Sequence, residues 1–225
     1  MRILIFGPNG SGKGTQSSFL VNQYQLAHVE SGGIFRQNIK GGTDLGKEAL
    51  KYIDKGELVP DSITIPMVLD RLAEDDCKGG FIVDGFPRTP AQAKALVDGL
   101  DAVNTPLNAV IIIDVTRETA RARLLGRRTC PNGHPNNCAI GKIAPKPEGG
   151  QFYCWSCNAE TTVRKDDIDE TAIDQRLDIY FTETVASIDE VKTWATSKIG
   201  VTVVTINGEG EIHDIRDNIF QAIAS

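Results

Sequence analysis

The sequence has few aromatic residues and no long apolar run. Aromatic side chains make up 6% of its 225 residues, and the longest apolar run is AVIII at 109–113. A membrane-spanning helix needs about 18 or more such residues. The N-terminal RILIF is also too short for the core of a secretory signal peptide, and glycine-rich sequence follows it at once. We therefore expect a cytoplasmic protein without membrane contact.

The sequence also lacks an excess of basic residues. Lys and Arg number 24 against 30 Asp and Glu, which gives a net charge of −6. The overall field of such a chain repels nucleic acid and anionic membranes. Any anionic ligand must therefore be bound by a local cluster of cationic side chains.

Four short apolar runs rich in β-branched residues are separated by segments of helical character. They are RILIF at 2–6, GFIVD at 80–84, AVIIID at 109–114 and VTVVTI at 201–206. Continuous rather than alternating apolar strands are typical of a parallel sheet covered on both faces. A buried helical turn is the alternative for any single run. The length favours one main domain with a small inserted unit.

Cysteine is scarce outside one segment. Residues 127–164 hold four of the five cysteines, together with four prolines, four glycines and few aliphatic residues. Disulfides are rare in the cytosol, so metal binding or simple burial is the expected role of these thiols. A segment of this composition cannot build its own apolar core and needs a crosslink. Cys77, outside the segment, is expected in the core.

The N-terminal RILIFGPNGSGKGTQSSFL reads as a strand, a glycine-rich turn and a helix. It has the spacing G-x-x-x-x-G-K, in which backbone N–H groups and the helix N-terminus surround phosphates and Lys13 supplies a point charge. Gly14 stands where the general pattern has Ser or Thr, and the hydroxyl follows as Thr15. A flexible turn with an incidental lysine is the alternative, which the flanking strand and helix disfavour.

Three motifs together resemble the adenylate kinases of the long, lidded type. They are GPNGSGKGTQ, DGFPRTPAQ at 84–92 and TVRKDD at 162–167, and the likeness extends over nearly the whole chain. The resemblance implies an α/β fold, a P-loop doubly wound parallel sheet of about five strands with helices on both faces. It also implies three parts: a core at 1–29, 60–126 and 165–225, an AMP-binding insertion at 30–59, and a lid with a metal knuckle at 127–164.

The same resemblance implies reversible phosphoryl transfer from ATP to AMP, giving two ADP, by a monomer that uses Mg²⁺ with the nucleotide. The matching ATP-binding positions are Gly10, Ser11, Gly12, Lys13, Gly14, Thr15, Arg127 and Gly210. The matching AMP-binding positions are Ser31, Arg36, Glu57, Leu58, Val59, Gly85, Phe86, Pro87, Arg88, Gln92, Arg164 and Arg176. Ser31 replaces the family's usual threonine, and Gly33 stands where aspartate is common.

The chemistry of these residue types suits phosphoryl transfer. The transition state is loose, so positioning and charge neutralisation dominate and no general base is required. One guanidinium group can donate two parallel hydrogen bonds to the oxygens of a phosphate. The resemblance implies that the catalytic residues are Lys13, Arg88, Arg123, Arg127, Arg164 and Arg176, with Asp84 holding Mg²⁺ through water. The side-chain amide of Gln92 is expected to pair with the amino group and a neighbouring ring nitrogen of adenine.

The cysteine segment has the spacing of a structural zinc site. Cys130-x3-His134 is followed after nineteen residues by Cys154-x2-Cys157. Three thiolates and an imidazole fill all four tetrahedral positions, so the metal is expected to be structural rather than catalytic. Fe²⁺ and Co²⁺ accept the same ligands as Zn²⁺. Cys138 is an alternative ligand, and four reduced, buried thiols are the alternative to a metal site.

Two other functions remain open on the sequence alone. One is a kinase for another nucleoside monophosphate, which Gln92 disfavours. The other is a P-loop protein that binds nucleic acid through its zinc knuckle. The negative net charge disfavours that second function, as do arginines that match phosphate-transfer positions.

Overall fold

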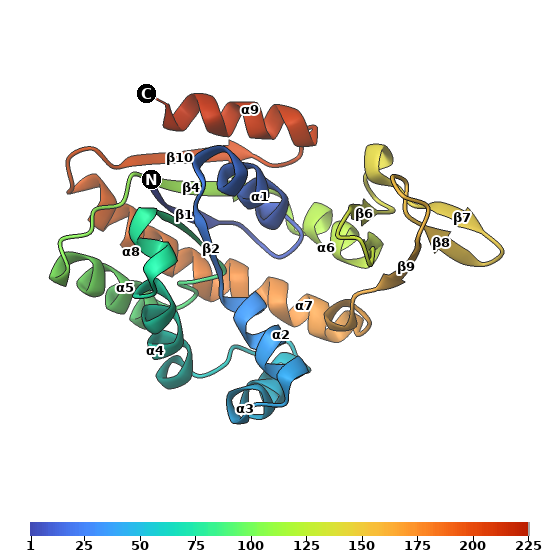
Figure 1. Ribbon diagram of the computed structural model, residues 1–225, viewed down its shortest axis with the longest axis horizontal. Helices are drawn as coiled ribbons and strands as arrows, with labels where there is room; N and C mark the ends of the chain where they lie inside the picture. The colour runs from blue at the N-terminus through green and yellow to red at the C-terminus, as the bar shows by residue number, and fades with distance from the viewer. Residues whose placement is uncertain (225) are drawn as a thin grey trace.

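The computed structural model describes residues 1–224, and its centre is a five-stranded parallel sheet (Figure 1). Residue 225, the end of the expected core range, lies outside the described residues. The strands are β1 (Arg2–Phe6), β2 (Ala27–Glu30), β3 (Phe81–Asp84), β4 (Ala109–Asp114) and β10 (Thr202–Asn207). Their order is β10-β4-β1-β3-β2, and every pair is parallel. The expected parallel α/β sheet is confirmed.

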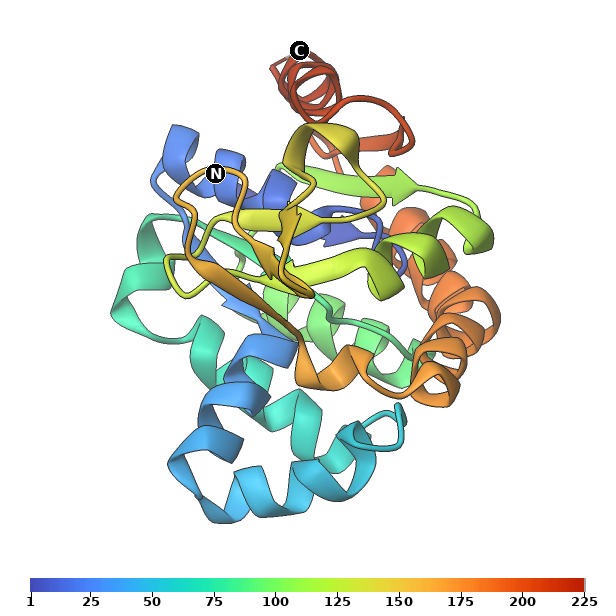
Figure 2. The ribbon, with the colours of Figure 1, turned by 90° about the vertical axis from the view of Figure 1, so that its right-hand side faces the viewer.

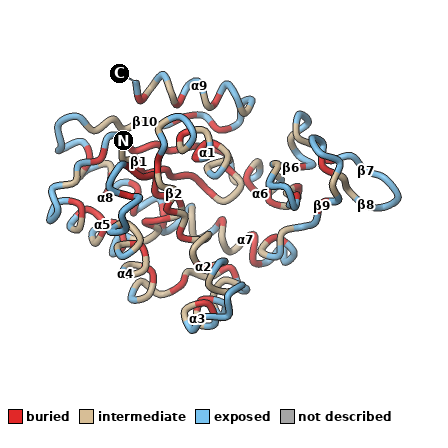
Figure 3. The backbone as a smooth tube through the Cα atoms, in the orientation of Figure 1, coloured by how far each residue is buried: buried red, intermediate tan, exposed pale blue. Residues whose placement is uncertain are grey.

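Successive side chains of each strand enter two separate apolar cores. Ile3 and Ile5 of β1 pack with α1 (Lys13–Tyr24) and α9 (Ile212–Ile223). Leu4 and Phe6 pack on the other face, with α4 (Asp61–Leu72), α5 (Pro90–Ala102) and α8 (Val185–Thr196). Both faces are therefore covered, which is why these strands are continuously apolar. Figure 3 shows the central strands as the most buried part of the chain.

The sequence did not predict β2. Its residues are AHVE, and Val29 is the only one that is fully buried. The strand lies at the edge of the sheet and pairs with β3 alone. A four-residue edge strand with two polar side chains lacks the apolar run that marks the central strands.

Residues 31–53 form two helices, α2 (Ser31–Gly41) and α3 (Asp44–Ile53), below the sheet in Figure 1. The Thr43 side chain accepts a hydrogen bond from the Gly46 N–H and so caps α3. A Cβ atom at Gly46 would lie 2.3 Å from the Asn38 carbonyl oxygen, so the helices cross too closely for any side chain there. Phe35 of α2 and Ala49 of α3 pack with Val59 in a small core of their own.

Residues 127–163 form a second, antiparallel sheet that projects from the core (Figures 1 and 2). Its strands are β5 (Arg127–Thr129), β6 (Pro135–Asn137), β7 (Lys146–Glu148), β8 (Gln151–Tyr153) and β9 (Glu160–Val163), in the order β6-β5-β9-β8-β7. No Ala, Val, Leu or Ile side chain of this segment is buried, whereas Cys130, Pro145 and Cys154 are. The predicted lack of an apolar core in this segment is confirmed.

Two helices connect this second sheet to the core. They are α6 (Arg117–Gly126) before it and α7 (Glu170–Ile179) after it, and Leu124, Ile173 and Leu177 pack between them. A π-helical turn at Tyr180–Thr184 joins α7 to α8, and short 3₁₀ turns lie at Asp75–Gly79, Gly141–Ile143 and Lys165–Asp167. Within residues 1–224, no helix has the length and apolar character required to cross a membrane.

The two-sided core gives a first prediction. Replacement of the fully buried Ile111 by alanine should lower the free energy of unfolding by about 2–5 kcal/mol, because it leaves a cavity in the central β4 strand. The matched control is Val103→Ala, at a side chain that is 69% exposed. This substitution should change the free energy of unfolding by less than about 0.5 kcal/mol. Denaturant titration measures both. Equal effects would contradict the assignment of this face as core.

Candidate active site

The turn between β1 and α1 has the backbone conformation of a phosphate-binding loop. Gly7, Gly10 and Gly12 have φ angles of 150°, 91° and 97°, a region that side chains rarely adopt. A Cβ atom at Gly10 would also lie 2.5 Å from the Ala120 carbonyl oxygen of α6. Glycine is therefore required both for the bend and for the close packing of the loop on α6.

A cavity of about 680 Å³ lies beside this loop, bounded by the α2–α3 segment, the carboxyl ends of β2 and β3, and the base of the second sheet. The predicted site residues that line it are Gly10, Ser11, Gly12, Lys13, Gly14, Thr15, Ser31, Arg36, Glu57, Leu58, Val59, Asp84, Gly85, Arg88, Gln92, Arg123, Arg127, Arg164, Arg176 and Gly210. Phe86 and Pro87 do not line it. They border a smaller cavity of about 20 Å³ behind Lys13 and Arg88, and Phe86 belongs to the apolar core.

Lys13, the first residue of α1, is close to the backbone of the loop. Its Nζ donates hydrogen bonds to the carbonyl oxygens of Gly7, at 2.5 Å, and Pro8, at 3.0 Å. Burial lowers the pKa of Lys13 to about 8, although the Asp84 carboxylate acts in the opposite direction. Burial also raises the pKa of Asp84, which Lys13 opposes. The site thus holds a desolvated cation and a desolvated carboxylate at the ends of neighbouring elements.

One buried carboxylate orients two of the arginines. Arg127 donates from Nε and Nη2 to the two oxygens of Asp167, at 2.6 and 2.9 Å. Arg176 of α7 donates from Nη2 to Asp167 Oδ1 at 2.9 Å, and the Asp167 side chain is fully buried. Paired hydrogen bonds of this kind set the plane of a guanidinium as well as its position. The Nη1 group of Arg127 takes no part in them.

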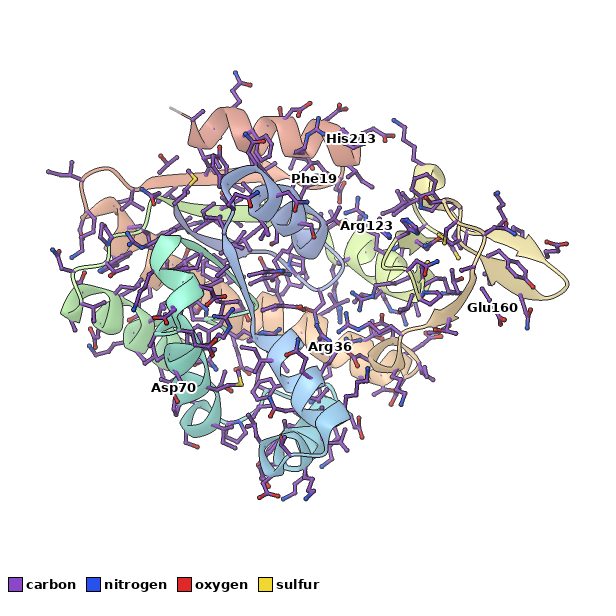
Figure 4. All side chains as sticks on the ribbon, viewed as in Figure 1. Phe19, Arg36, Asp70, Arg123, Glu160 and His213 are labelled. Atoms are coloured by element: carbon purple, nitrogen blue, oxygen red, sulfur yellow. The ribbon has the colours of Figure 1, made fainter. Side chains whose placement is uncertain are left out.

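A second set of carboxylates pairs with Arg164 and with Arg36, the latter labelled on α2 in Figure 4. Arg164 donates to Asp166 Oδ2 from Nη2, at 2.5 Å, and from Nε, at 2.9 Å. Arg36 forms an ion pair with Glu30 and lies 3.9 Å from Asp166. Burial alone would raise the pKa of Glu30, but the charge and hydrogen bond of Arg36 outweigh it and lower that pKa.

Arg123 and Arg88 are held by backbone carbonyl groups instead. Arg123 Nη1 donates to the Gly208 carbonyl oxygen at 2.9 Å, and Arg88 Nε donates to that of Gly85 at 2.8 Å. The Ser31 hydroxyl donates to the same Gly85 oxygen at 2.7 Å. Desolvation lowers the pKa of Arg88, although Asp84 opposes it. Among residues 1–224, no carboxylate forms an ion pair with either arginine, so both can bind an anionic ligand.

Sequence reasoning found Asp84 and Glu57 but missed the carboxylates that pair with the arginines and with Gln92, which are Glu30, Asp61, Asp166 and Asp167. Asp166 and Asp167 stand in TVRKDD next to Arg164, and that adjacency of opposite charges was an available signal. Glu30 and Asp61 carry no comparable signal. Asp61 accepts a hydrogen bond from Gln92, and 31 positions separate the two residues along the chain.

The four predicted metal ligands lie together. The Sγ atoms of Cys130, Cys154 and Cys157 and a ring nitrogen of His134 are within 4.8 Å of one another. Cys130 Sγ is 3.5 Å from Cys157 Sγ and 3.8 Å from His134 Nδ1. Tetrahedral zinc with Zn–S bonds of about 2.3 Å needs sulfur atoms about 3.8 Å apart. The spacing therefore fits a tetrahedral metal ion.

The surroundings of Cys154 and Cys157 lower the pKa of both thiols and so favour their ionised, metal-binding form, whereas desolvation raises the pKa of Cys130. Asn132 Nδ2 donates to Cys157 Sγ and Asn136 Nδ2 to Cys154 Sγ, each at 3.3 Å. The hydrogen bond from Asn132 is the largest cause that lowers the pKa of Cys157, to about 7. Cys138 is exposed and lies outside the group, and Cys77 is buried in the main core.

Comparison with known proteins agrees with this geometry. The family profile described as "Adenylate kinase" matches residues 5–196. An "Adenylate kinase" of Nitratidesulfovibrio vulgaris (strain Miyazaki F) is 49% identical over 230 aligned positions, which cover 100% of both chains. One from Desulfatibacillum aliphaticivorans is 47% identical over 224 positions, 97% of this chain and 98% of the relative. The chain therefore belongs to the adenylate kinase family, the enzymes that transfer a phosphoryl group between ATP and AMP to give two ADP.

Proposed function

We propose that this transfer takes place in the 680 Å³ cavity, with ATP at the phosphate loop and AMP at the α2–α3 segment. One observation carries the proposal: Lys13 and arginines from separate elements converge on one cavity in a chain whose net charge is −6. On this proposal the chain has three parts, a core, an AMP-binding insertion and a lid. Residues 1–29, 60–126 and 165–225 act as the core, 30–59 as the AMP-binding insertion and 127–164 as the lid.

The residues divide by the nucleotide that they bind. The ATP side comprises Gly10, Ser11, Gly12, Lys13, Gly14, Thr15, Arg123, Arg127 and Gly210. The AMP side comprises Ser31, Arg36, Glu57, Leu58, Val59, Gly85, Arg88, Gln92, Arg164 and Arg176. Phe86 and Pro87 do not line the cavity, so we assign them to shaping the loop that carries Arg88.

Charge neutralisation explains how this site promotes the reaction. The transferred group passes through a loose transition state whose negative charge spreads over its oxygens. Lys13 and Arg88 are desolvated, and a cation in a site of low polarity stabilises developing negative charge more strongly than it does in water. Adenylate kinases use Mg²⁺ with the nucleotide, where it adds further positive charge at the phosphates. We assign Asp84 to holding that ion through water.

The lid has to close so that water does not replace AMP as the acceptor. Lys142 of the lid lies 3.0 Å from Glu211, in the loop before α9, and so joins the lid to the core across the ATP side. The lid's Cys130, His134, Cys154 and Cys157 are proposed to hold Zn²⁺, with Fe²⁺ or Co²⁺ as substitutes, in a structural role. We further propose a cytoplasmic monomer that maintains the adenine nucleotide balance without nucleic acid partners.

Removal of the phosphate-binding cations should abolish most activity. We expect Lys13→Met and Arg88→Ala each to lower kcat/KM by about 100-fold or more, since each removes positive charge from the transition state. AMP-dependent ADP formation measures this, and GMP, CMP and UMP as acceptors test the base. The exposed Lys94→Met is the matched control and should retain full activity. Near wild-type rates in either site variant would contradict the assignment.

Activity should depend on the charge of Lys13. The ammonium is present below its pKa of about 8 and is lost above it, so kcat/KM for ATP should fall as the pH rises beyond about 8. Lys13→Arg, which stays charged, should retain its lower activity to higher pH. A pH profile of kcat/KM checks both, and a wild-type profile flat to pH 10 would refute the role of this lysine.

Removal of the metal should loosen the lid and spare the chemistry. Structural zinc contributes on the order of 10 kcal/mol of binding free energy to the folding of such sites, so chelation should lower the melting temperature. The core keeps its own sheet, and some activity should persist at low temperature. Cys154→Ser should lose the metal, whereas the control Cys138→Ser should keep it, as metal analysis can show. Unchanged melting after chelation would overturn the structural role.

A further inference from the structure

The side-chain amide of Gln92 is held by two partners of opposite and fixed polarity. Gln92, in the first turn of α5, is 2% exposed and lines the cavity on its AMP side. Its Oε1 accepts a hydrogen bond from the backbone N–H of Arg88 at 2.8 Å. Its Nε2 donates to Asp61 Oδ1, in the first turn of α4, at 2.6 Å.

These partners permit only one orientation of the amide. A backbone N–H can only donate and a carboxylate can only accept. Exchange of Oε1 and Nε2 would place oxygen against the Asp61 carboxylate and an amino group against the Arg88 N–H. Both hydrogen bonds would be lost, and each would be replaced by a contact between groups of like polarity.

Asp61 is itself held in position. Its Oδ2 accepts a hydrogen bond from the Thr89 hydroxyl at 2.9 Å. The Thr89 oxygen in turn accepts from the backbone N–H of Gln92 at 3.1 Å, so the hydroxyl proton is directed at Asp61. The N-terminus of α4 also favours a carboxylate in its first turn. The orientation of the Gln92 amide is therefore determined by the start of two helices.

The fixed orientation leaves Gln92 with a defined recognition pattern. An amide has two N–H donors and two lone pairs, and one of each is used by Asp61 and Arg88. The remaining lone pair on Oε1 can accept from the amino group of a 6-aminopurine, and the remaining N–H can donate to the adjacent N1. A 6-oxopurine has an acceptor at position 6 and a donor at N1, so it matches only the reversed amide.

We infer that Asp61 is a specificity-determining positioning residue, which makes the monophosphate site accept 6-aminopurines and reject 6-oxopurines by fixing the Gln92 amide. The inference rests on the proposed function, in which Gln92 faces the base of AMP. Asp61 does not line the cavity and acts through Gln92. Asp61 thereby disfavours 6-oxopurines as well as favouring 6-aminopurines, because a 6-oxopurine would leave buried polar groups of the site unpaired.

The test compares AMP with IMP, which differs from it only at position 6 and N1. In Asp61→Ala, the ratio of kcat/KM for IMP to that for AMP should rise about 10-fold or more, since a charge-assisted hydrogen bond no longer opposes the reversed amide. The KM for AMP should rise several-fold, whereas the KM for ATP should stay within about twofold. Asp61→Asn can still accept from Gln92, so its KM for AMP should stay near that of the wild type and its IMP to AMP ratio should lie between the other two.

A matched control separates selectivity from helix stability. Asp70→Ala removes an exposed carboxylate from the same helix α4 and should leave the IMP to AMP ratio unchanged (Figure 4). Asp61→Ala and Asp61→Asn both remove charge from the helix N-terminus and should lower the melting temperature alike. The loss of selectivity should be larger in Asp61→Ala, which a purely structural role would not produce.

Two results would overturn the inference. One is an unchanged IMP to AMP ratio in Asp61→Ala, and the other is an equal rise of KM for ATP and AMP. The variant Gln92→Leu shows whether the proposed role of Gln92 or only the inference about Asp61 is wrong. If this variant leaves the KM for AMP unchanged, the proposed role of Gln92 fails, and the inference about Asp61 fails with it. If it raises the KM for AMP while Asp61→Ala alters neither that KM nor the ratio, only the inference about Asp61 is wrong.

Discussion

Mutual repulsion among the cations around one cavity is the constraint on which the site depends. Lys13 and several arginines line the same cavity, and two unit charges 4 Å apart repel each other by about 4 kcal/mol at an effective dielectric constant of 20. Carboxylates between them reduce this cost. Asp167 lies between Arg127 and Arg176, and Asp166 lies against Arg164. Both Arg127, at the start of the lid, and Arg176, on α7, are hydrogen-bonded to Asp167. These hydrogen bonds therefore hold the start of the lid next to α7.

The register of the sheet decides which loops meet at the cavity. β1 and β3 are parallel neighbours, and Ile5 pairs with Asp84. The phosphate loop that follows β1 and the DGFPR segment that follows β3 therefore leave the same edge side by side. Ligands of open α/β sheets bind at this carboxyl edge. A shift of either strand would separate Lys13 from Arg88, so the covered apolar strands are also what aligns the charges.

The core and the lid are stabilised by different means. Apolar side chains on both faces of the parallel sheet stabilise the core, whereas no Ala, Val, Leu or Ile side chain of residues 127–163 is buried. The lid instead has short strands and four clustered side chains that could hold a metal ion. A metal crosslink can order such a segment without extending the core. The lid is joined to the core by polar contacts, among them Lys142 with Glu211 and Asn137 with Arg123.

The sequence by itself determined several features that a short segment encodes. The glycines around Lys13, the cysteine spacing and the apolar central strands were each predictable, because their geometry depends on neighbours along the chain. Only the tertiary structure decided which distant groups pair. The edge strand β2 needs β3 as its partner, and Asp61 meets Gln92 only because α4 and α5 begin side by side. Such contacts leave no local pattern, since packing between elements brings the two side chains together.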